Sequence, residues 1–352
     1  MGSCAFKNSQ KPNDVKDSIQ NRLIKDITPI TGETTKIFNF PFNNSSISSL
    51  FSTPFEVYGE YPSKFDQPFA SKPMKFKDPR SANLFSIHKI AVSCHKGLKT
   101  CQNQDNFSLV SGPGVLCVGV FDGHGENGHE ISFLAHKYLI KNLFSTNKLD
   151  YQSAFSNTNQ EISEKCKEKQ IDYTHSGSTS TLVTIAHNKL TVAHIGDSRA
   201  ILIKRYKNSL ISVPLTIDHN LKDPLESARV VENGAHIVKR FKNDVKRIYI
   251  PRDSMGIAVT RAFGDSAFNN VGVISEPCVR DIQLDGTEEF LVVASDGVWD
   301  VVHGWEIAAA LESGESKKVC ENYAKIAWDR WIGETKDVVD DITLVIIPFS
   351  EV

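Results

Sequence analysis

The sequence lacks the cysteine patterns that indicate a disulfide framework or a zinc site. Its 352 residues include seven cysteines, an odd number, and none of them forms a Cys-x-x-Cys pair. No cysteine is followed by an arginine at the sixth position, so a cysteine-based phosphate-binding loop is also absent. We therefore expect reduced thiols and a cytoplasmic location.

Other absences exclude further classes of protein. No apolar run approaches the roughly 20 residues that span a bilayer, and the first residues lack the apolar region of a signal peptide. The formal net charge of −2 gives no electrostatic argument for binding nucleic acid. The sequence contains no glycine-rich P-loop, no kinase catalytic-loop motif and no internal repeat.

The amino terminus has two interpretations. Gly2 follows Met1 as at an N-myristoylation site, and Cys4 offers a position for a second acyl chain, although Phe6 replaces the usual Ser or Thr. One myristoyl chain holds a membrane only weakly, so we expect membrane association only if Gly2 and Cys4 are acylated. The alternative is an ordinary Met-Gly start.

The chain divides into an N-terminal extension, residues 1–80, and one regular domain, residues 81–352. Between residues 37 and 74, Ser, Asn and Pro alternate with scattered Phe, and the pattern has neither a helical nor a strand period. Such a segment is typical of an unstructured extension, or of one whose Phe side chains dock onto the domain or a partner.

Within the domain, groups of strands alternate with pairs of helices. Strands are predicted at 85–92, 106–110, 115–121, 181–187, 190–195, 199–204, 211–214, 290–294 and 342–349. The strands 181–187 and 190–195 form a hairpin, and the next two extend the same sheet. Helices are predicted at 131–144, 151–169, 224–234, 305–311 and 317–331. Paired helices favour an α+β sandwich of antiparallel strands over a βαβ alternation.

Four of the apolar strands carry aspartates at one end. Strands this apolar are buried, and burying an unpaired carboxylate is costly. Carboxylates that converge repel one another unless a cation lies between them. The pattern therefore predicts a cluster of hard divalent cations held by oxygen ligands, and the aspartates are Asp122, Asp197, Asp296 and Asp340.

The segment Asp122-Gly123-His124-Gly125 suggests how such a cluster works. Gly123 lets the backbone bend so that its carbonyl faces a cation, and His124 then donates a proton to a leaving oxygen. For an isolated segment of this kind, the alternative is a tight turn in which Asp122 caps the next helix. Oxygen ligands favour Mg²⁺ or Mn²⁺, and two such ions about 3.5–4 Å apart activate a bridging water for attack on phosphorus.

Eight segments in order along residues 85–349 carry a resemblance to a known family. They are QNQDN at 102–106, VFDGHG at 120–125, SGSTST at 176–181, AHIGDSRA at 193–200, LTIDH at 215–219, AVTRAFGD at 258–265, ASDGVWD at 294–300 and DDIT at 340–343. With these motifs the chain resembles the metal-dependent serine/threonine protein phosphatases of the 2C type, the PPM family.

The resemblance implies a fold and a set of roles. The fold is a four-layer α/β/β/α sandwich, in which helices flank two antiparallel sheets. Asp122 bridges both metals, the Gly123 carbonyl binds the second, and Asp296 and Asp340 complete the first. His124 is the general acid, and Asp197 helps to bind a weaker third metal. Residues 218–255 correspond to the family's variable flap, whose basic residues either steer substrates or form a solvated loop.

Two positions depart from the family pattern. Many relatives have Glu where this chain has Gln104, so Asp105 serves the second metal directly or through water. Many relatives also have an Arg where this chain has Thr100, and Lys99 or Lys96 could then hold the substrate phosphate, with a point charge in place of a bidentate fork. Lys99 is the candidate taken here, and the alternative is an ordinary surface lysine. Four further residues that match family motifs are interpreted as supporting or structural, namely Arg199, Thr260, Arg261 and Asp265.

These observations predict a monomeric Mg²⁺- or Mn²⁺-dependent phosphatase of phosphoserine and phosphothreonine in proteins. The mechanism is direct attack by a hydroxide that bridges two metal ions, with Asp122 and His124 as the catalytic residues. Two alternatives stay open: a catalytically weak regulatory module that binds a kinase or phosphoprotein, and a hydrolase of small phosphate esters.

Overall fold

The computed structural model describes residues 55–63, 66–77, 89–112, 114–145, 148–239, 245–250 and 253–349. All of them belong to the unit formed by residues 37–352. Gly2, Cys4 and most of the predicted extension lie outside the described residues, so the predictions about them stay predictions. No helix in these ranges combines the length and apolar composition that crossing a bilayer requires.

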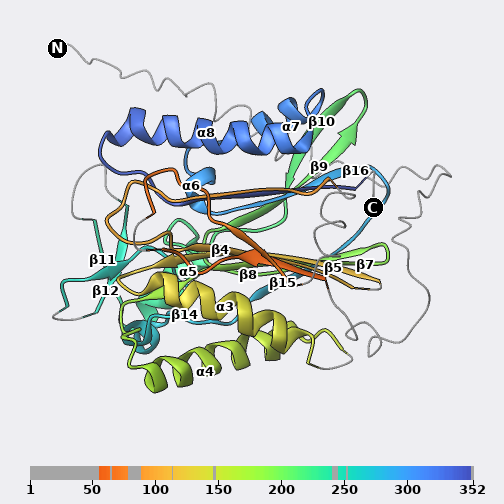
Figure 1. The fold of residues 1–352 in the computed structure, drawn as a ribbon. Helices are drawn as coiled ribbons and strands as arrows, with labels where there is room; N and C mark the ends of the chain where they lie inside the picture. The colour runs from red at the N-terminus through yellow and green to blue at the C-terminus, as the bar shows by residue number, and fades with distance from the viewer. Residues whose placement is uncertain are drawn as a thin grey trace, which may run out of the picture. The chain divides into compact units, whose positions relative to one another are not determined.

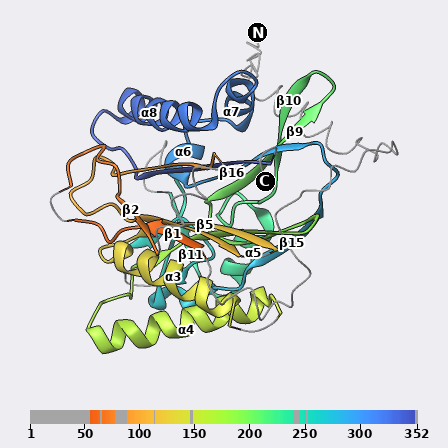
Figure 2. The ribbon, with the colours of Figure 1, turned by 45° about the vertical axis from the view of Figure 1, so that its right-hand side comes forward.

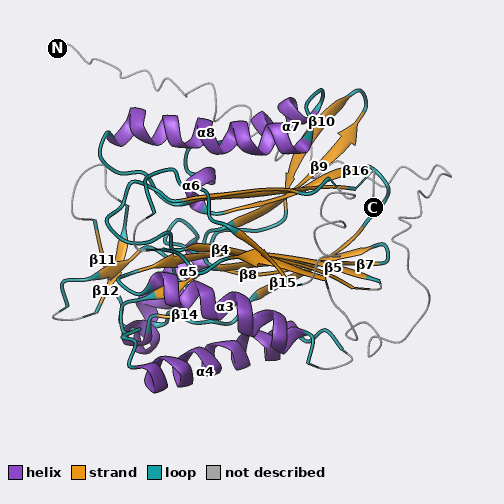
Figure 3. Cartoon of the chain, viewed as in Figure 1, coloured by secondary structure: helices purple, strands orange, loops and turns teal. Residues whose placement is uncertain are grey.

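The described residues form four layers, which confirms the predicted α+β sandwich (Figures 1 and 3). Two antiparallel sheets lie face to face. Helices α3 (Gly128–Leu143) and α4 (Tyr151–Lys169) cover the outer face of the first sheet, and α7 (Gly304–Leu311) and α8 (Ser316–Thr335) cover that of the second. Buried apolar side chains fill each of the three spaces between layers, with Phe107 and Leu202 between the sheets, Phe121 under α3 and Ile346 under α8.

The first sheet has the strand order β15-β8-β7-β5-β4-β1-β2, and β6 joins it beside β5 and pairs with β14. Its strands are β1 Phe55–Gly59, β2 Met74–Phe76, β4 Asp105–Gly112, β5 Val115–His124, β6 Gly177–Ser178, β7 Ser180–Ala186, β8 Lys189–Ile195, β14 Phe263–Gly264 and β15 Cys278–Gln283. The β7–β8 hairpin is confirmed.

The second sheet has the order β10-β9-β16-β17-β3. Its strands are β3 Ala91–His95, β9 Arg199–Tyr206, β10 Ser209–Pro214, β16 Glu288–Ala294 and β17 Ile342–Pro348. The prediction that 199–204 and 211–214 extend the sheet of the hairpin is therefore wrong. Gly196 adopts a φ of +88° directly after β8, and this left-handed turn leads the chain from one sheet to the other.

Helices α4 and α5 begin at the predicted residues, and each has a side-chain cap at its start. The Asp150 carboxylate accepts a hydrogen bond from the Ser153 backbone N–H and starts α4, and Asp223 with Pro224 starts α5. The helices are α3 Gly128–Leu143, α4 Tyr151–Lys169, α5 Pro224–Glu232, α6 Asp296–Trp299, α7 Gly304–Leu311 and α8 Ser316–Thr335, with a 3₁₀ turn at Ser266–Val271.

Two regions differ from the sequence prediction. Residues 55–59 and 74–76, for which the sequence pattern predicted no strand, form β1 and β2 at the edge of the first sheet, so this part of the extension lies on the folded domain (Figure 2). The flap contains a small sheet of β11 His236–Val238, β12 Arg247–Tyr249 and β13 Gly256–Ile257. Strands this short carry too few residues to show a period.

Candidate metal and catalytic site

Seven of the eight predicted site residues line one cavity of about 460 Å³. The cavity lies where the end of β5 meets the start of α6 and the chain before β17, and residues 255–259, at the end of the flap and just after it, form another part of its wall. The seven residues are Lys99, Asp122, Gly123, His124, Asp197, Asp296 and Asp340. Segments from both sheets and far apart in the sequence thus meet at one place.

The carboxyl groups of Asp122 and Asp296 both line the cavity, and each affects the ionisation of the other. The pKa of each is raised well above its ordinary value, first by burial and then by neighbouring carboxylates. For Asp122 these neighbours are Asp296, Asp105 and Asp340. The acids therefore converge, as the strand-end pattern predicted.

Asp105 is the predicted residue that does not line the cavity. It is fully buried and lies opposite Asp122 in the register of β4 and β5. Its Oδ2 accepts a hydrogen bond of 2.7 Å from Ser295, while its Oδ1 has no hydrogen-bond partner. Burial, with Asp341 as the next cause, raises its pKa to about 7. Gln104 lines the cavity instead, and its Nε2 donates to the Gly125 carbonyl at 2.6 Å.

Gly123 is required for close packing and not for a left-handed bend. A Cβ atom at this position would lie 2.2 Å from the carbonyl oxygen of Gly128. Gly297 has the same role beside Asp296, because a Cβ there would lie 1.9 Å from the Asp341 carbonyl oxygen. The two glycines let the backbones that carry Asp122 and Asp296 approach their neighbours.

Lys99 contacts an acid of the same cavity. Its Nζ forms an ion pair with Asp340 Oδ1. Burial alone would lower the pKa of this ammonium, but Asp340, Asp341 and Asp122 outweigh burial and raise it well above its ordinary value. Asp341, which the sequence did not single out, accepts hydrogen bonds from the backbone N–H groups of Gly97 (2.6 Å) and Gln104 (2.8 Å).

His124 has a carboxylate partner that sequence reasoning interpreted only as supporting. Its Nε2 lies 2.6 Å from Asp265 Oδ2. Burial would lower the pKa of His124, but Asp265 and then Asp197 outweigh it, so the pKa is raised. Asp265 is fully buried and has a φ of +46°, directly after the left-handed Gly264. That unusual backbone directs its carboxylate toward His124.

Comparison with known proteins identifies the family. A family model described as protein phosphatase 2C matches residues 86–330. The chain belongs to the protein phosphatase 2C family. With that membership it is a protein serine/threonine phosphatase, in a family that generally depends on Mg²⁺ or Mn²⁺.

Relatives and solved structures agree with this family. The chain is 30% identical over 287 residues to "Probable protein phosphatase 2C 72" of Arabidopsis thaliana, covering 74% of this chain and 85% of that protein. It is 32% identical over 285 residues to "Probable protein phosphatase 2C 61" of the same plant, covering 76% and 85%. The crystal structure of a Toxoplasma gondii serine-threonine phosphatase 2C has the same fold, with a TM-score of 0.64, 21% identity and coverage of 74% and 94%.

The cavity offers donor atoms of the type that hard divalent cations bind. Asp122, Asp197, Asp296 and Asp340 offer carboxylate oxygens, which Mg²⁺ and Mn²⁺ prefer. Among the described residues, no group of three or more His, Cys, Asp or Glu side chains is gathered as a ready ligand set for one ion. Lys99 supplies the positive charge that contacts Asp340.

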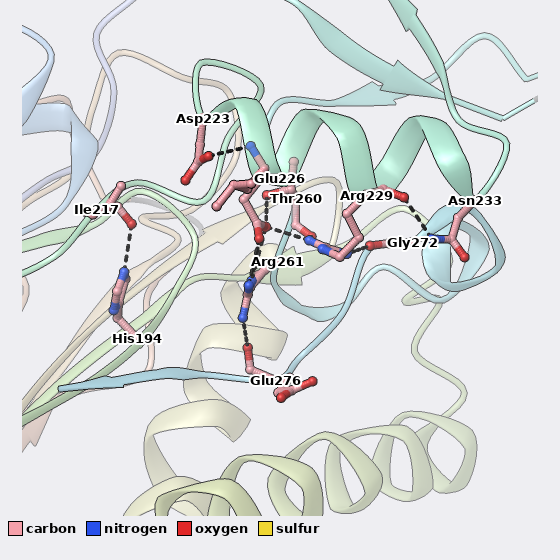
Figure 4. Close-up of polar contacts among 11 residues, drawn as sticks. His194, Ile217, Asp223, Glu226, Arg229, Asn233, Thr260, Arg261, Gly272 and Glu276 are labelled. Atoms are coloured by element: carbon pink, nitrogen blue, oxygen red, sulfur yellow. Dashed lines mark hydrogen bonds and ion pairs between the residues drawn. The ribbon is translucent and has the colours of Figure 1, made fainter.

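A buried ion-pair network supports the flap side of the cavity (Figure 4). The Glu226 carboxylate on α5 accepts hydrogen bonds from Arg261 (2.7 Å), Arg229 (2.5 Å) and Thr260 (2.6 Å). Arg261 also donates to the Glu276 carbonyl at 2.9 Å. Thr260 and Arg261 therefore tie α5 to the chain that leads from the cavity wall toward Asp265, which agrees with the structural role predicted for them.

Asp197 lies in a second group of charges at the cavity. Burial, and then Asp218 and Asp300, raise its pKa to about 7. The Arg199 guanidinium donates two hydrogen bonds to Asp218, at 2.6 and 2.7 Å, and so holds this acid in a fixed orientation. This pairing supports the structural interpretation of Arg199.

Proposed function

We propose that this cavity hydrolyses phosphoserine and phosphothreonine in proteins, with Mg²⁺ or Mn²⁺ held by Asp122, Asp296 and Asp340. The observation that carries the proposal is the convergence of these three acids, from separate segments, on a cavity that His124 also lines. Bound divalent cations supply charge neutralisation and activate water for attack on phosphorus. Asp105 supports the site from behind Asp122, and Asp197 belongs to a weaker third cation position.

His124 is proposed as the proton donor. Asp265 and Asp197 raise the pKa of His124 above its ordinary value, which favours the protonated form that a general acid requires. Asp265 fixes the orientation of the ring through the 2.6 Å contact with Nε2. When a seryl or threonyl oxygen leaves phosphorus, His124 supplies the proton and Asp265 stabilises the charged form beforehand.

Lys99 is proposed to hold the substrate phosphate. Its ammonium lines the cavity and forms an ion pair with Asp340, one of the acids proposed to hold the metal. If a cation bound Asp340, the Lys99 ammonium would be available to the phosphate. The contact between Lys99 and Asp340 also favours the alternative of a catalytically weak module that binds phosphoproteins, because it occupies one proposed metal ligand.

The test measures dephosphorylation of a phosphothreonine peptide and of a small phosphate ester, each with Mn²⁺ and with chelator. We expect Mn²⁺-dependent turnover of the peptide that Asp296→Ala and Asp122→Asn abolish. Asp329→Asn is the matched control, because Asp329 is an exposed aspartate on α8. Peptide binding without turnover would favour the regulatory module, and turnover of the ester alone would favour a small-molecule hydrolase.

A further inference from the structure

A segment outside the family match contacts the edges of both sheets. Residues 55–63 and 66–77, here called the N-terminal clamp, precede residues 86–330 that match the family model. Strand β1 pairs with β4 of the first sheet, and β2 pairs with β1 (Figure 2). The same clamp exchanges backbone hydrogen bonds with the end of β3 in the second sheet, from Phe69 N–H to the Lys96 carbonyl at 2.9 Å and from Lys96 N–H to the Ala70 carbonyl at 3.0 Å.

Aromatic side chains anchor the clamp between these edges. The Phe69 ring stacks on His95 with a centroid distance of 4.3 Å and also contacts Trp328 of α8 at 5.1 Å. The Tyr61 hydroxyl donates a 2.6 Å hydrogen bond to Glu130 of α3. The clamp thus contacts the helical layers on both sides of the sandwich, and these contacts fix the residues between its anchors.

Lys72 of the clamp reaches under the loop that enters the cavity. Only 6% of Lys72 is exposed, and its Nζ donates hydrogen bonds to the backbone carbonyls of Asp105 and Asn103. These residues end the site loop, residues 97–104, which carries Lys99 and Gln104 into the cavity. A buried ammonium needs acceptors, and here the acceptors are the backbone of this loop.

Other groups also hold the site loop, at both of its ends. Lys96 Nζ donates to the Lys99 carbonyl at 2.8 Å. Asp341 binds the N–H groups of Gly97 and Gln104. Lys72 supplies the contact at Asn103 and Asp105 that these groups do not make.

We propose that Lys72 is a positioning residue for the site loop, so that the N-terminal clamp sets where Lys99 and Gln104 stand in the cavity. The effect on catalysis rests on the proposed function, whereas the effect on loop order does not. Loss of a charged hydrogen-bond donor to buried carbonyls increases local opening by about tenfold or more.

The test compares Lys72→Met with the matched control Lys75→Met in the full chain. Lys75 is on the same clamp, but its side chain is 56% exposed. For Lys72→Met we expect hydrogen exchange of the amides in 97–105 to accelerate about tenfold while the amides of α4 keep their rates. On a phosphothreonine peptide, kcat/KM should fall by a similar factor, and Lys75→Met should match the wild type.

A second variant displaces Lys72 without removing its charge. A Cβ atom at Gly59 would lie 2.7 Å from Lys72 Cδ and 2.6 Å from Asn106 Oδ1, so Gly59→Ala should displace Lys72 together with Asn106 and produce a smaller acceleration of exchange in the same loop. If Lys72→Met does not fold, hydrogen exchange of Gly59→Ala provides the test instead.

Two results would overturn the proposal. One is unchanged exchange in the site loop of the folded variants, and the other is an increase spread evenly over the domain, which indicates general destabilisation. A wild-type protein without phosphatase activity would refute the proposed function, yet the exchange rates would still decide the role of Lys72.

Discussion

The Lys99 ammonium and the Asp340 carboxylate form an ion pair across 241 residues of sequence. The pair joins the loop before β4 to the chain before β17, at the cavity that also holds Asp122 and Asp296. Lys99 therefore neutralises one of the acids that we propose as metal ligands. Any cation that binds Asp340 must compete with the Lys99 ammonium.

Removing this charge should separate metal binding from substrate binding. We expect Lys99→Met to bind Mn²⁺ several-fold more tightly by calorimetry, because a competing cation is gone. The KM for a phosphothreonine peptide should rise about tenfold, since the phosphate loses a charged hydrogen bond. Lys318→Met, whose lysine is 74% exposed on α8, is the control. Weaker Mn²⁺ binding in Lys99→Met would contradict the competition.

The role of His124 depends on the leaving group. A seryl oxygen needs a proton to depart, whereas p-nitrophenolate leaves without one. We expect His124→Gln to reduce kcat on a phosphoserine peptide about 100-fold or more and to affect p-nitrophenyl phosphate far less. Asp265→Asn should also reduce kcat more on the phosphoserine peptide than on p-nitrophenyl phosphate, but by a smaller factor, because Asp265 acts through His124. Equal losses on both substrates would argue against proton donation.

Glu226 should be important for stability rather than for chemistry. Its carboxylate is only 4% exposed and neutralises Arg229 and Arg261. Breaking a buried pair leaves uncompensated charge, so Glu226→Gln should lower the free energy of unfolding by about 3 kcal/mol in urea titrations. The exposed Glu232 on the same helix provides the control, and Glu232→Gln should stay within about 0.5 kcal/mol of the wild type. Equal stability of the two variants would show that the network contributes little.

The stability of the fold should depend on pH through His136. Burial, followed by the charges of Lys72 and Lys137, lowers the pKa of His136 to about 3 in the folded protein, against about 6.5 in the unfolded chain. Between these values the unfolded chain binds a proton that the folded protein does not, so this contribution to the free energy of unfolding decreases as pH falls from 6.5.

The matched variant for this prediction is His136→Phe, since His136 already packs against the rings of Tyr58 and Phe133. In urea titrations between pH 6.5 and 4, the wild type should lose up to about 1.4 kcal/mol per pH unit more than the variant. If the free energy of unfolding changed with pH equally in both proteins, the pKa of His136 would not be lowered by burial.

Local signals allowed the sequence to predict many elements. The helical pattern of residues 151–169 predicted α4 where the structure has it, and the structure adds the Asp150 cap at its start. Asp122, Asp296 and Asp340 could be predicted as neighbours because each borders a buried strand. These predictions needed only burial and the periodicity of helices and strands.

The features that the sequence did not predict depend on contacts between distant segments. Strand β1 is stabilised by pairing with β4, so its own residues show no clear period. The position of Asp105 behind Asp122 follows from the register of β4 and β5, which side-chain types alone do not specify. The partnership of His124 with Asp265 spans 141 residues and needs the left-handed backbone at Asp265.

Asp122 is carried by a strand of the first sheet, whereas Asp296 and Asp340 border strands of the second. Their spacing is therefore a property of how the two halves of the sandwich meet, and no single loop determines it. Phe107 and Leu202 lie among the apolar side chains between the two sheets, and we expect a substitution there to shift one group of acids relative to the other. We therefore expect that a substitution in the buried core can reduce activity even though every residue that contacts the substrate is unchanged.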